Sequence, residues 1–522
     1  MVSMDSNTDK TVEEPGSSAK ENNGVPVANE PKQVPKNKCM SGKMARIVKY
    51  LLYGFGGVFL LLGLAITGFW RPLYRHLLAS NLALTNGSQA KELWTNGAVP
   101  LYFRVYMFNW TNPIQTLGHI EKPNFEENGP YTFRFQQLKS DIVWNNNHTV
   151  TYNGRRVWDF VPEKSKGSLT DIITSINVVA VSIGDQARWL NHFDKILVNQ
   201  LLAYNEKQLY VTKTVEELLF QGYQDKILDL GKILKKYIKN FDYMTDKFGW
   251  YFGKNESQVD VYNIHTGTDN IDVLGNVHAW NYKTQCGVYS GRCDQVHGSL
   301  GDLWPMNITE GDIASLFISD LCGAFDMSKI GPRELYDVEG VRFAGTERTF
   351  DNGGKYPENS CYCKDNQCTM APGVRNLSAC LRAPIYVSFP HFYLADPSYT
   401  KDINGMNPSA EKHEFSFTMQ KDSGVMMEIF ARLQINVKVE AFQGLNFFSN
   451  LPSMLVPSLW FDQYIEMPDE FKRKLKFGFN QVPNLLAASG FVFVILGALL
   501  LVSGFVVARL SYSSVPYTVG DI

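Results

Sequence analysis

The longest apolar runs in the chain lie near its two ends. Residues 50–70 form an uncharged run of about 21 residues, and residues 485–508 form one of about 24 residues that Arg509 closes. A helix needs about 20 apolar residues to cross a hydrocarbon layer of about 30 Å. The first run starts too far into the chain to be a signal peptide, whose apolar region has about 7–15 residues. The pattern therefore predicts two membrane-spanning helices, at residues 46–70 and 485–508.

Basic residues set the expected orientation of these helices. The first run is preceded by Lys36, Lys38, Lys43, Arg46 and Lys49, whereas only Arg71 and Arg75 follow it closely. Basic residues favour the cytosolic side of a membrane. The second run has the opposite local bias, with a basic cluster at residues 472–476 before it, but long loops are translocated largely regardless of charge. We expect both tails, 1–45 and 509–522, in the cytosol and residues 71–484 outside it.

The segment between the runs differs in composition from the amino tail. Residues 1–45 are rich in Asn, Lys, Glu, Pro and Ser, which indicates a disordered tail. Alternating stretches at 151–160, 413–419 and 433–442 predict strands. Residues 163–304 lack proline, and apolar residues recur there at helical spacing, which predicts a helical bundle set into a β-rich body. The two predicted apolar faces are Trp189, Phe193, Ile196, Leu197, Leu201 and Tyr204, and Leu219, Tyr223, Ile227, Leu230, Leu234 and Tyr237.

Sequons and cysteines point to an oxidising compartment for the same segment. Every usable Asn-x-Ser/Thr sequon lies between the two runs, so we expect glycosylation there. These sequons begin at Asn86, Asn109, Asn147, Asn255, Asn307 and Asn376. Cys39 lies in the amino tail, and the other seven cysteines lie between Cys286 and Cys380. Spacing alone does not assign their partners.

A zinc site is the alternative for the closely spaced cysteines Cys361, Cys363 and Cys368. Zinc sites usually show paired Cys-x2–4-Cys or His-x3–5-His units, and no His lies between Cys361 and Cys380. Disulfide bonds are therefore the favoured interpretation in an extracellular or lumenal segment.

Composition excludes several functional classes. The 522 residues carry 50 basic and 52 acidic side chains, a net charge of −2, which gives no electrostatic case for nucleic-acid binding. A mean hydropathy of −0.18 excludes a polytopic transporter. No G-x-S-x-G, H-E-x-x-H or P-loop motif is present, so we expect no enzyme, no cofactor and no metal, and a structural role for His391. An ecto-hydrolase and a two-span ligand-gated channel rank lower, the channel because neither run contains Asp, Glu, Asn, Gln or His, the residues that commonly line a pore.

Three longer stretches carry a family resemblance. Residues 112–135 (NPIQTLGHIEKPNFEENGPYTFRF), 383–399 (APIYVSFPHFYLADPSY) and 432–442 (RLQINVKVEAF) resemble signature stretches of the class B scavenger receptors. This family includes fatty-acid translocase, the high-density lipoprotein receptor, the lysosomal integral membrane protein and the insect sensory neuron membrane proteins. The resemblance covers about residues 45–510.

The resemblance implies a fold and a function. The fold is a two-span membrane protein with an α+β ectodomain, a large antiparallel β-barrel and a membrane-distal helical bundle at about residues 168–229. The implied function is a surface receptor for fatty acids, sterols, phospholipids or lipoproteins, which delivers lipid to the membrane through a tunnel in the ectodomain or mediates particle uptake. Burial of a lipid chain is favourable by about 0.8 kcal/mol per CH2, so an apolar conduit lowers the transfer barrier. The alternative is a lysosomal or endosomal receptor that binds a cargo protein at its apex, and a homo-oligomer is possible.

The resemblance also assigns individual residues. It implies disulfides between Cys293 and Cys361, Cys322 and Cys380, and Cys363 and Cys368, and it leaves Cys286 as a free thiol, an alternative partner for Cys293 or an intermolecular link. Lys207 falls near the position where the family has an apical lysine that contacts anionic lipid, so it is either a ligand contact or an ordinary solvated lysine. Phe193, Ile196 and Leu197 are candidate ligand contacts on the same bundle. The lysines between Lys226 and Lys239 form either a solvated helix face or a surface that binds anionic particles.

Two features of the tails and spans lie outside this scheme. Cys39 is close enough to the membrane for palmitoylation, and Tyr512 begins a stretch that resembles an endocytic signal. Gly490, Gly497 and Gly504 recur every seven residues on one face of the second run, which predicts close packing against another helix. The first run offers a counterpart stripe of Gly54, Gly57, Leu61, Leu64 and Gly68.

Overall fold

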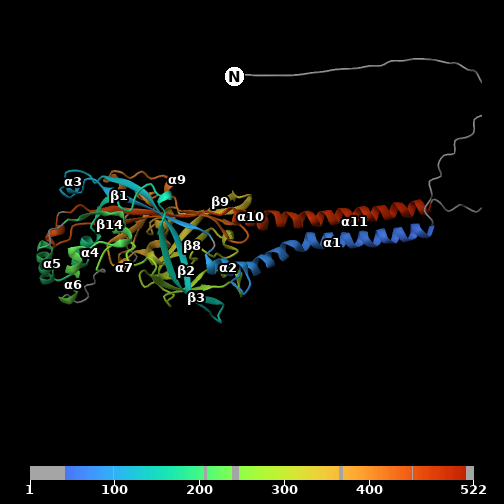
Figure 1. Ribbon diagram of the computed structural model, residues 1–522, viewed down its shortest axis with the longest axis horizontal. Helices are drawn as coiled ribbons and strands as arrows, with labels where there is room; N and C mark the ends of the chain where they lie inside the picture. Colours follow the sequence, from blue (N-terminus) through green and yellow to red (C-terminus); the bar gives the residue numbers. More distant parts are fainter. Residues whose placement is uncertain are drawn as a thin grey trace, which may run out of the picture. The chain divides into compact units, whose positions relative to one another are not determined.

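The computed structural model describes residues 42–97, 99–204, 208–237, 246–363, 368–449 and 451–512. Cys39, Lys207 and the residues that follow Tyr512 lie outside the described residues. The chain divides into two compact units, one drawn from residues 1–60 and 495–522 and the other from residues 61–494. Figure 1 shows the elements of both units by label and colour.

A large antiparallel sheet forms the body of the second unit. Its strands follow the order β7-β6-β3-β2-β1-β15-β14-β13-β10-β9-β8, with β12 pairing to β14 and β11 to β12. The strands are β1 (Leu101–Trp110), β2 (Phe125–Trp144), β3 (Thr149–Phe160), β6 (Gln258–His265), β7 (Val277–Trp280), β8 (Ile313–Ile318), β9 (Gly323–Leu335), β10 (Val338–Ala344), β11 (Val374–Asn376), β12 (Ile385–Ser388), β13 (Ser416–Gln420), β14 (Met426–Val439) and β15 (Met454–Ile465).

The two ends of this sheet are joined by a short segment at Gly298 and Ser299. Val277 N in β7 donates to Gly298 O (2.8 Å), and Phe317 N in β8 donates to Ser299 O (2.8 Å). Because Ser299 N also donates to Ser315 O (3.0 Å), the segment bridges both edge strands. The sheet is thereby nearly closed into a barrel, which leaves few unpaired edge groups. This confirms the expected antiparallel β-barrel.

Alternation along the strands separates two chemically different faces. In β1, Phe103, Val105 and Met107 are buried and pack in the main core, as the two-residue period of a strand requires. The intervening Arg104 and Tyr106 point to the other face, where they lie opposite Asp462 and Trp460 of β15. One face is therefore an apolar core, and the other carries a ladder of polar and aromatic pairs.

A helical cap covers one end of the barrel. Figure 1 shows α4, α5 and α6 together at the end of the second unit that lies away from α10. The cap consists of β4 (Ile172–Ile176), α4 (Val178–Ala187), α5 (His192–Tyr204), β5 (Tyr210–Thr214), the π-helical turn η2 (Glu217–Gln221) and α6 (Lys226–Tyr237). The other short helices are α2 (Gln89–Asn96), α3 (Pro113–Leu117), α7 (Ser378–Leu381), α8 (Ser398–Lys401) and α9 (Ala410–His413).

The apolar face predicted for α5 is wrong in part. Trp189 lies in the connection before α5, and Trp189, Phe193 and Ile196 are exposed. The buried residues are Val198 and Leu202, because apolar side chains surround most of this helix and its period fits more than one face. The second predicted face is confirmed at its described positions, with Leu219, Tyr223, Ile227 and Leu234 buried.

Two long helices contain the apolar runs. They are α1 (Gly42–Leu82) and α11 (Val482–Tyr512), the latter preceded by α10 (Asp469–Lys476) and the π-helical turn η12 (Phe477–Gln481). Both are long and apolar enough to cross a membrane, which agrees with the prediction of two spans.

Glycines let the two long helices approach each other. In the first unit, a Cβ atom at Gly497 would lie 2.5 Å from Leu60 N, and in the second unit one at Gly490 would lie 2.6 Å from Thr67 Oγ1. The stripe on α11 thus packs against α1 as predicted. The predicted counterpart is wrong. Gly54, Gly57 and Gly68 have no neighbour within 4 Å of an added Cβ, whereas the contact positions on α1 are Gly56 and Gly63.

Candidate functional site

Large apolar side chains are exposed together on the helical cap. The exposed fractions are 76% for Trp189, 81% for Phe193 and 42% for Ile196. They come from the α4–α5 connection and from α5, so all three belong to the same short part of the cap. Single exposed apolar residues are ordinary, but a cluster of large ones marks an interaction surface. We call Trp189, Phe193 and Ile196 the cap surface.

An ion-pair network holds the base of the cap surface. Arg188 pairs with Asp185 (3.1 Å) and with Glu440, and its guanidinium lies 4.8 Å from the centre of the Trp189 ring. Burial raises the pKa of Asp185, against the opposing effect of Arg188. These contacts fix the start of the connection that presents Trp189.

The predicted ligand contacts fall into different environments. Phe193 and Ile196 belong to the cap surface, whereas Leu197 is half-buried and packs against the main core. Lys207 is outside the described residues. On α6, Lys232 pairs with Asp229 (3.4 Å) and Asp246 (2.7 Å), so this charge is partly compensated.

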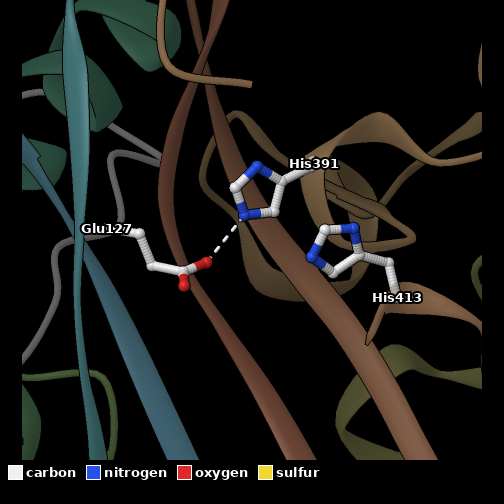
Figure 2. A group of neighbouring side chains, drawn as sticks. All are labelled: Glu127, His391 and His413. Atoms are coloured by element: carbon white, nitrogen blue, oxygen red, sulfur yellow. Dashed lines mark hydrogen bonds and ion pairs between the residues drawn. The ribbon is translucent and has the colours of Figure 1, made fainter. Parts of the chain in front are cut away.

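Two imidazoles and a carboxylate meet on the polar face of the barrel. Figure 2 shows Glu127 of β2 pointing at His391, with His413 beside it. His391 Nε2 lies 2.7 Å from Glu127 Oε2, and Trp460 Nε1 donates to the same oxygen (2.7 Å). The two imidazole rings stack with centroids 4.3 Å apart. The ligand atoms of this group lie within 4.8 Å of one another, a spacing compatible with a metal ion.

Backbone hydrogen bonds oppose metal binding at this group. Asn407 N donates to His391 Nδ1 (3.0 Å), and Ser409 N donates to His413 Nδ1 (3.0 Å). Each neutral ring therefore carries its proton on Nε2, because a neutral imidazole has one N–H and one acceptor nitrogen. A metal needs the Nε2 lone pair, and both rings would have to lose a backbone hydrogen bond to supply it. The residues do not fit a metal site.

The same bonds give the imidazoles a positioning role. The bonds from Asn407 N and Ser409 N tie together the segment from β12 to β13, which contains both histidines, and His391 attaches that segment to Glu127 of β2 and to Gln434 of β14. Burial, followed by the neighbouring His391, lowers the pKa of His413 to about 3. Burial opposes ionisation of Glu127, whereas the hydrogen bonds from His391 and Trp460 favour it. The net result is a lowered pKa of Glu127. Neither imidazole hydrogen-bonds to a Ser, Thr or Cys side chain among the described residues, so the structural role expected for His391 agrees with its contacts.

Three disulfides close the segment from η4 (Gly291–Asp294) to α7. They join Cys293 to Cys361, Cys322 to Cys380, and Cys363 to Cys368, the same pairs that the resemblance implies. Cys286 is half-buried and free. Burial, reinforced by Asp294, raises the pKa of the Cys286 thiol to about 12, which keeps it protonated and weakly reactive.

The sequon asparagines differ in their surroundings. Asn86, Asn147, Asn255 and Asn376 are exposed, whereas Asn109 and Asn307 are partly buried. The Asn109 side chain accepts a hydrogen bond from Thr174 N (2.9 Å), which ties β1 to β4. The glycosylation predictions therefore remain predictions, most easily met at the four exposed positions.

A polar groove of about 470 Å³ lies beside α3. Asn112 Nδ2 donates to Glu121 Oε2 (3.1 Å), and Asn124 Nδ2 donates to Thr111 Oγ1 (2.8 Å), so the groove walls bond to each other. Its lining is Thr111, Asn112, Glu121, Lys122, Asn124 and Asn404. It lacks the apolar surface that a lipid site needs.

Reasoning from the sequence missed the partners of His391. Glu127, His413 and Trp460 lie far from it in the chain, and only the register of β1, β2 and β15 brings Glu127 and Trp460 together. The residues around His413 contain no motif that signals this contact. Sequence reasoning named Phe193 and Ile196 of the cap surface as candidate ligand contacts, but it did not name Trp189 as one.

Comparison with known proteins gives a consistent result. The model of the CD36 family matches residues 54–508. The chain is 34% identical over 407 residues to Protein peste of Drosophila melanogaster, covering 77% of this chain and 72% of that protein. It is 26% identical over 466 residues to scavenger receptor class B member 1 of Bos taurus, covering 88% of each. It is 27% identical over 426 residues to human lysosome membrane protein 2, covering 80% of this chain and 86% of that protein.

Proposed function

The chain belongs to the CD36 family of class B scavenger receptors, and on this premise we propose that it is a two-span membrane receptor that docks lipid particles on its cap surface and passes their lipid to the bilayer. The expected ligands are fatty acids, sterols, phospholipids or lipoproteins. Relatives named scavenger receptors support the receptor class. The observation that carries the proposal for this chain is the exposed cluster of Trp189, Phe193 and Ile196.

The cap surface suits a lipid particle better than it suits a small polar ligand. Removal of its aromatic and aliphatic side chains from water lowers the free energy by about 25 cal/mol per Å² of apolar area. Trp in particular combines a large apolar ring with a polar N–H, which favours the boundary between lipid and water. The guanidinium of Arg188 beneath Trp189 holds the ring in place rather than adding a free charge.

The interior of the barrel supports the second step. The core face of β1, β2 and β15 is lined by apolar and aromatic side chains, among them Phe103, Phe133 and Phe461. The helical cap covers one end of this core, and the cap carries the docking surface. A lipid that moves along such a face avoids exposure of its chains to water, and no chemical step is needed.

Transport and location can be tested together in cells. Tagged full-length chain is expressed, located by microscopy, and assayed for uptake of labelled fatty acid and of labelled lipoprotein. Surface location with uptake above that of untransfected cells supports the proposal. Surface location without uptake of either ligand contradicts it.

A receptor for a cargo protein in lysosomes or endosomes is the second candidate. It is supported by the similarity to human lysosome membrane protein 2, whose 27% identity is comparable to the 26% identity of the bovine scavenger receptor. Endolysosomal location without lipid uptake in the same assay would favour this candidate.

The proposed topology places both termini in the cytosol. Residues 71–484 then face the exterior or a lumen, where the three disulfides form and the sequons are glycosylated. Palmitoylation of Cys39 would anchor the amino tail to the inner leaflet. Protease protection of tags at either end, in sealed vesicles, tests this arrangement.

A further inference from the structure

Two histidines lie side by side on the strand pair formed by β6 and β7. His265 is the last residue of β6, and His278 belongs to β7. Their ring centres are 5.3 Å apart, and the ring planes are inclined at 86° to each other. His278 is exposed and His265 is half-buried, so solvent reaches the pair. We call His265 and His278 the β6–β7 histidines.

A β-bulge brings the two rings together. Ile264 of β6 pairs with Val277 of β7, and the residue before Ile264 pairs with Ala279, so His278 is the extra residue of the bulge. Bulges redirect side chains and are common next to functional sites. In this bulge the ring of His278 is placed against the ring of His265. The strand pairing therefore fixes the positions of both imidazoles.

The ring nitrogens of the β6–β7 histidines are unbonded. Neither His265 nor His278 makes a side-chain hydrogen bond within the part of the chain that the structure describes. His391 and His413 differ, because each accepts a backbone hydrogen bond at Nδ1. Burial, followed by the neighbouring His278, lowers the pKa of His265 against the opposing effect of Asp269, which favours the neutral ring. A neutral imidazole with an available lone pair is the form that binds a transition metal.

The ring separation fits two imidazoles bound to one ion. With a Zn–N distance of about 2.0–2.1 Å, each ring centre lies about 3.2 Å from the ion, and a tetrahedral angle at the ion puts two ring centres about 5.2 Å apart. The observed 5.3 Å matches this value. The stacked rings of His391 and His413, at 4.3 Å, are too close to be two ligands of a tetrahedral ion.

A carboxylate stands beside the β6–β7 histidines. Asp269 is exposed in the loop after β6, and its charge acts on the ring of His265. Asp269 makes no hydrogen bond or ion pair with any other described residue. Its loop is anchored, because Thr266 Oγ1 donates to His148 O (2.8 Å) and Thr268 Oγ1 lies 3.1 Å from His148 Nδ1. Two imidazoles and one carboxylate are a frequent set of zinc ligands.

From this arrangement we propose that His265, His278 and Asp269 form a binding site for a divalent transition-metal ion of the class of Zn²⁺ and Cu²⁺. Two neutral ring nitrogens and one carboxylate oxygen suit an ion of this class, whereas Mg²⁺ and Ca²⁺ prefer oxygen ligands alone. Rotation of the exposed Asp269 side chain brings its carboxylate to the ion, and water takes the remaining position. The ion links β6, β7 and the loop that follows β6.

The site adjoins the place where α1 joins the barrel. Leu84 N, shortly after the end of α1, donates to Thr266 O (2.9 Å), and Thr266 directly follows His265. An ion that links β6 to β7 therefore also strengthens the attachment of the first span. Because the three ligands come together only in the folded chain, the ion should raise the unfolding temperature of the ectodomain.

The test titrates Zn²⁺ into metal-free, detergent-purified full-length chain that carries a histidine-free tag, with calorimetry as the measurement. Loss of even an outer partner of a metal site weakens binding about 10- to 100-fold, so His278→Gln and Asp269→Asn should each weaken Zn²⁺ binding at least about 10-fold. Mg²⁺ at the same concentration should not compete. The matched control is His119→Asn, which removes an exposed histidine from the turn before β2 and keeps a residue that tolerates its positive φ of 58°. This control should bind Zn²⁺ like the parent.

Cu²⁺ gives an independent measure of the ligands. Electron paramagnetic resonance of the Cu²⁺-loaded parent should show splitting from two imidazole nitrogens, and His278→Gln should show splitting from one. The inference is overturned if the parent binds no Zn²⁺, or if His278→Gln or Asp269→Asn binds it within twofold of the parent. It is also overturned if His119→Asn is weakened as much as they are, which would indicate adventitious binding only. Equal unfolding temperatures of the metal-free variants and parent show that folding does not account for a difference.

Discussion

Phe193 offers the sharpest test of the cap surface, because nearly all of its side chain is available to a partner. The change is Phe193→Ser, which removes the ring and leaves the rest of α5 in place. With 81% of the residue exposed, its folding contribution is small, and we expect the free energy of unfolding to change by no more than about 0.5 kcal/mol. The effect should therefore fall on docking alone.

The size of the docking effect follows from the exposed area. Complete burial of a Phe side chain is worth about 1.5–3 kcal/mol, and the exposed four-fifths of this one corresponds to about 1.2–2.4 kcal/mol if the particle covers it. This predicts a dissociation constant about 7- to 60-fold larger for the variant. Full-length chain in nanodiscs, immobilised on a sensor surface, is titrated with lipoprotein or with phospholipid vesicles.

Tyr282→Ser is the matched control. Tyr282 is an aromatic residue at 80% exposure, close to the 81% of Phe193, but it lies in the turn after β7 and outside the cap surface. We expect its binding to equal that of the parent. The reasoning is refuted if Phe193→Ser binds within twofold of the parent, or if Tyr282→Ser is weakened to the same degree.

Three further predictions concern stability and the spans. The pKa of His413 is about 3 in the folded chain and about 6.5 in the unfolded chain, so the free energy of unfolding decreases as pH falls below 6.5. Chemical denaturation should show a loss of about 2–3 kcal/mol between pH 7.5 and 4.5. The variant His413→Asn, which keeps an acceptor for Ser409 N, should not show this loss. Replacing Cys322 and Cys380 together by Ala opens a link across 58 residues and should lower the free energy of unfolding by about 4 kcal/mol, measured against denaturant, and a loss below about 1 kcal/mol would contradict this. Gly497→Leu should reduce crosslinking between the two spans, because a Cβ at this position would lie 2.5 Å from Leu60 N. Gly57→Leu is the control and should leave crosslinking unchanged, because a Cβ there has no neighbour within 4 Å. Equal crosslinking in the two variants would refute the packing.

The sequence predicted the parts of the fold that local pattern determines. The two spans follow from length and hydropathy alone, and strands such as β3 follow from two-residue alternation. The order of strands in the barrel does not follow from such patterns. It depends on long-range pairings such as Arg104 with Asp462, and the resemblance to a family supplied only the barrel architecture and not this order.

Helix faces show where periodicity stops being informative. In α5 the apolar residues surround most of the helix, so the period admits a face containing Phe193 and Ile196 as well as the observed one containing Val198 and Leu202. In α1 the glycines are numerous enough to form more than one stripe. Gly56 and Gly63 were passed over although their spacing of seven residues matches the stripe on α11.

The candidate sites were only partly accessible to sequence reasoning. Phe193 and Ile196 were identified as candidate contacts, and both are exposed. The contacts of the histidine pair depend on which groups meet in space, and hydrogen-bond partners hundreds of residues apart leave no local signal. His391 was expected to be structural for want of a nucleophile, and its tautomer now gives a physical reason.

Passage of lipid through the barrel interior is the central claim, and a blocked barrel tests it most directly. A cysteine in place of Phe461, on the core face of β15, is labelled with a bulky thiol reagent in full-length chain reconstituted into liposomes, and the parent treated with the same reagent is the control for Cys286 and Cys39. Transfer of fluorescent fatty acid from donor particles into the liposomes is measured together with particle binding. The account predicts that the labelled variant binds particles like the parent while its transfer rate falls to that of protein-free liposomes. Undiminished transfer through the labelled barrel would contradict it.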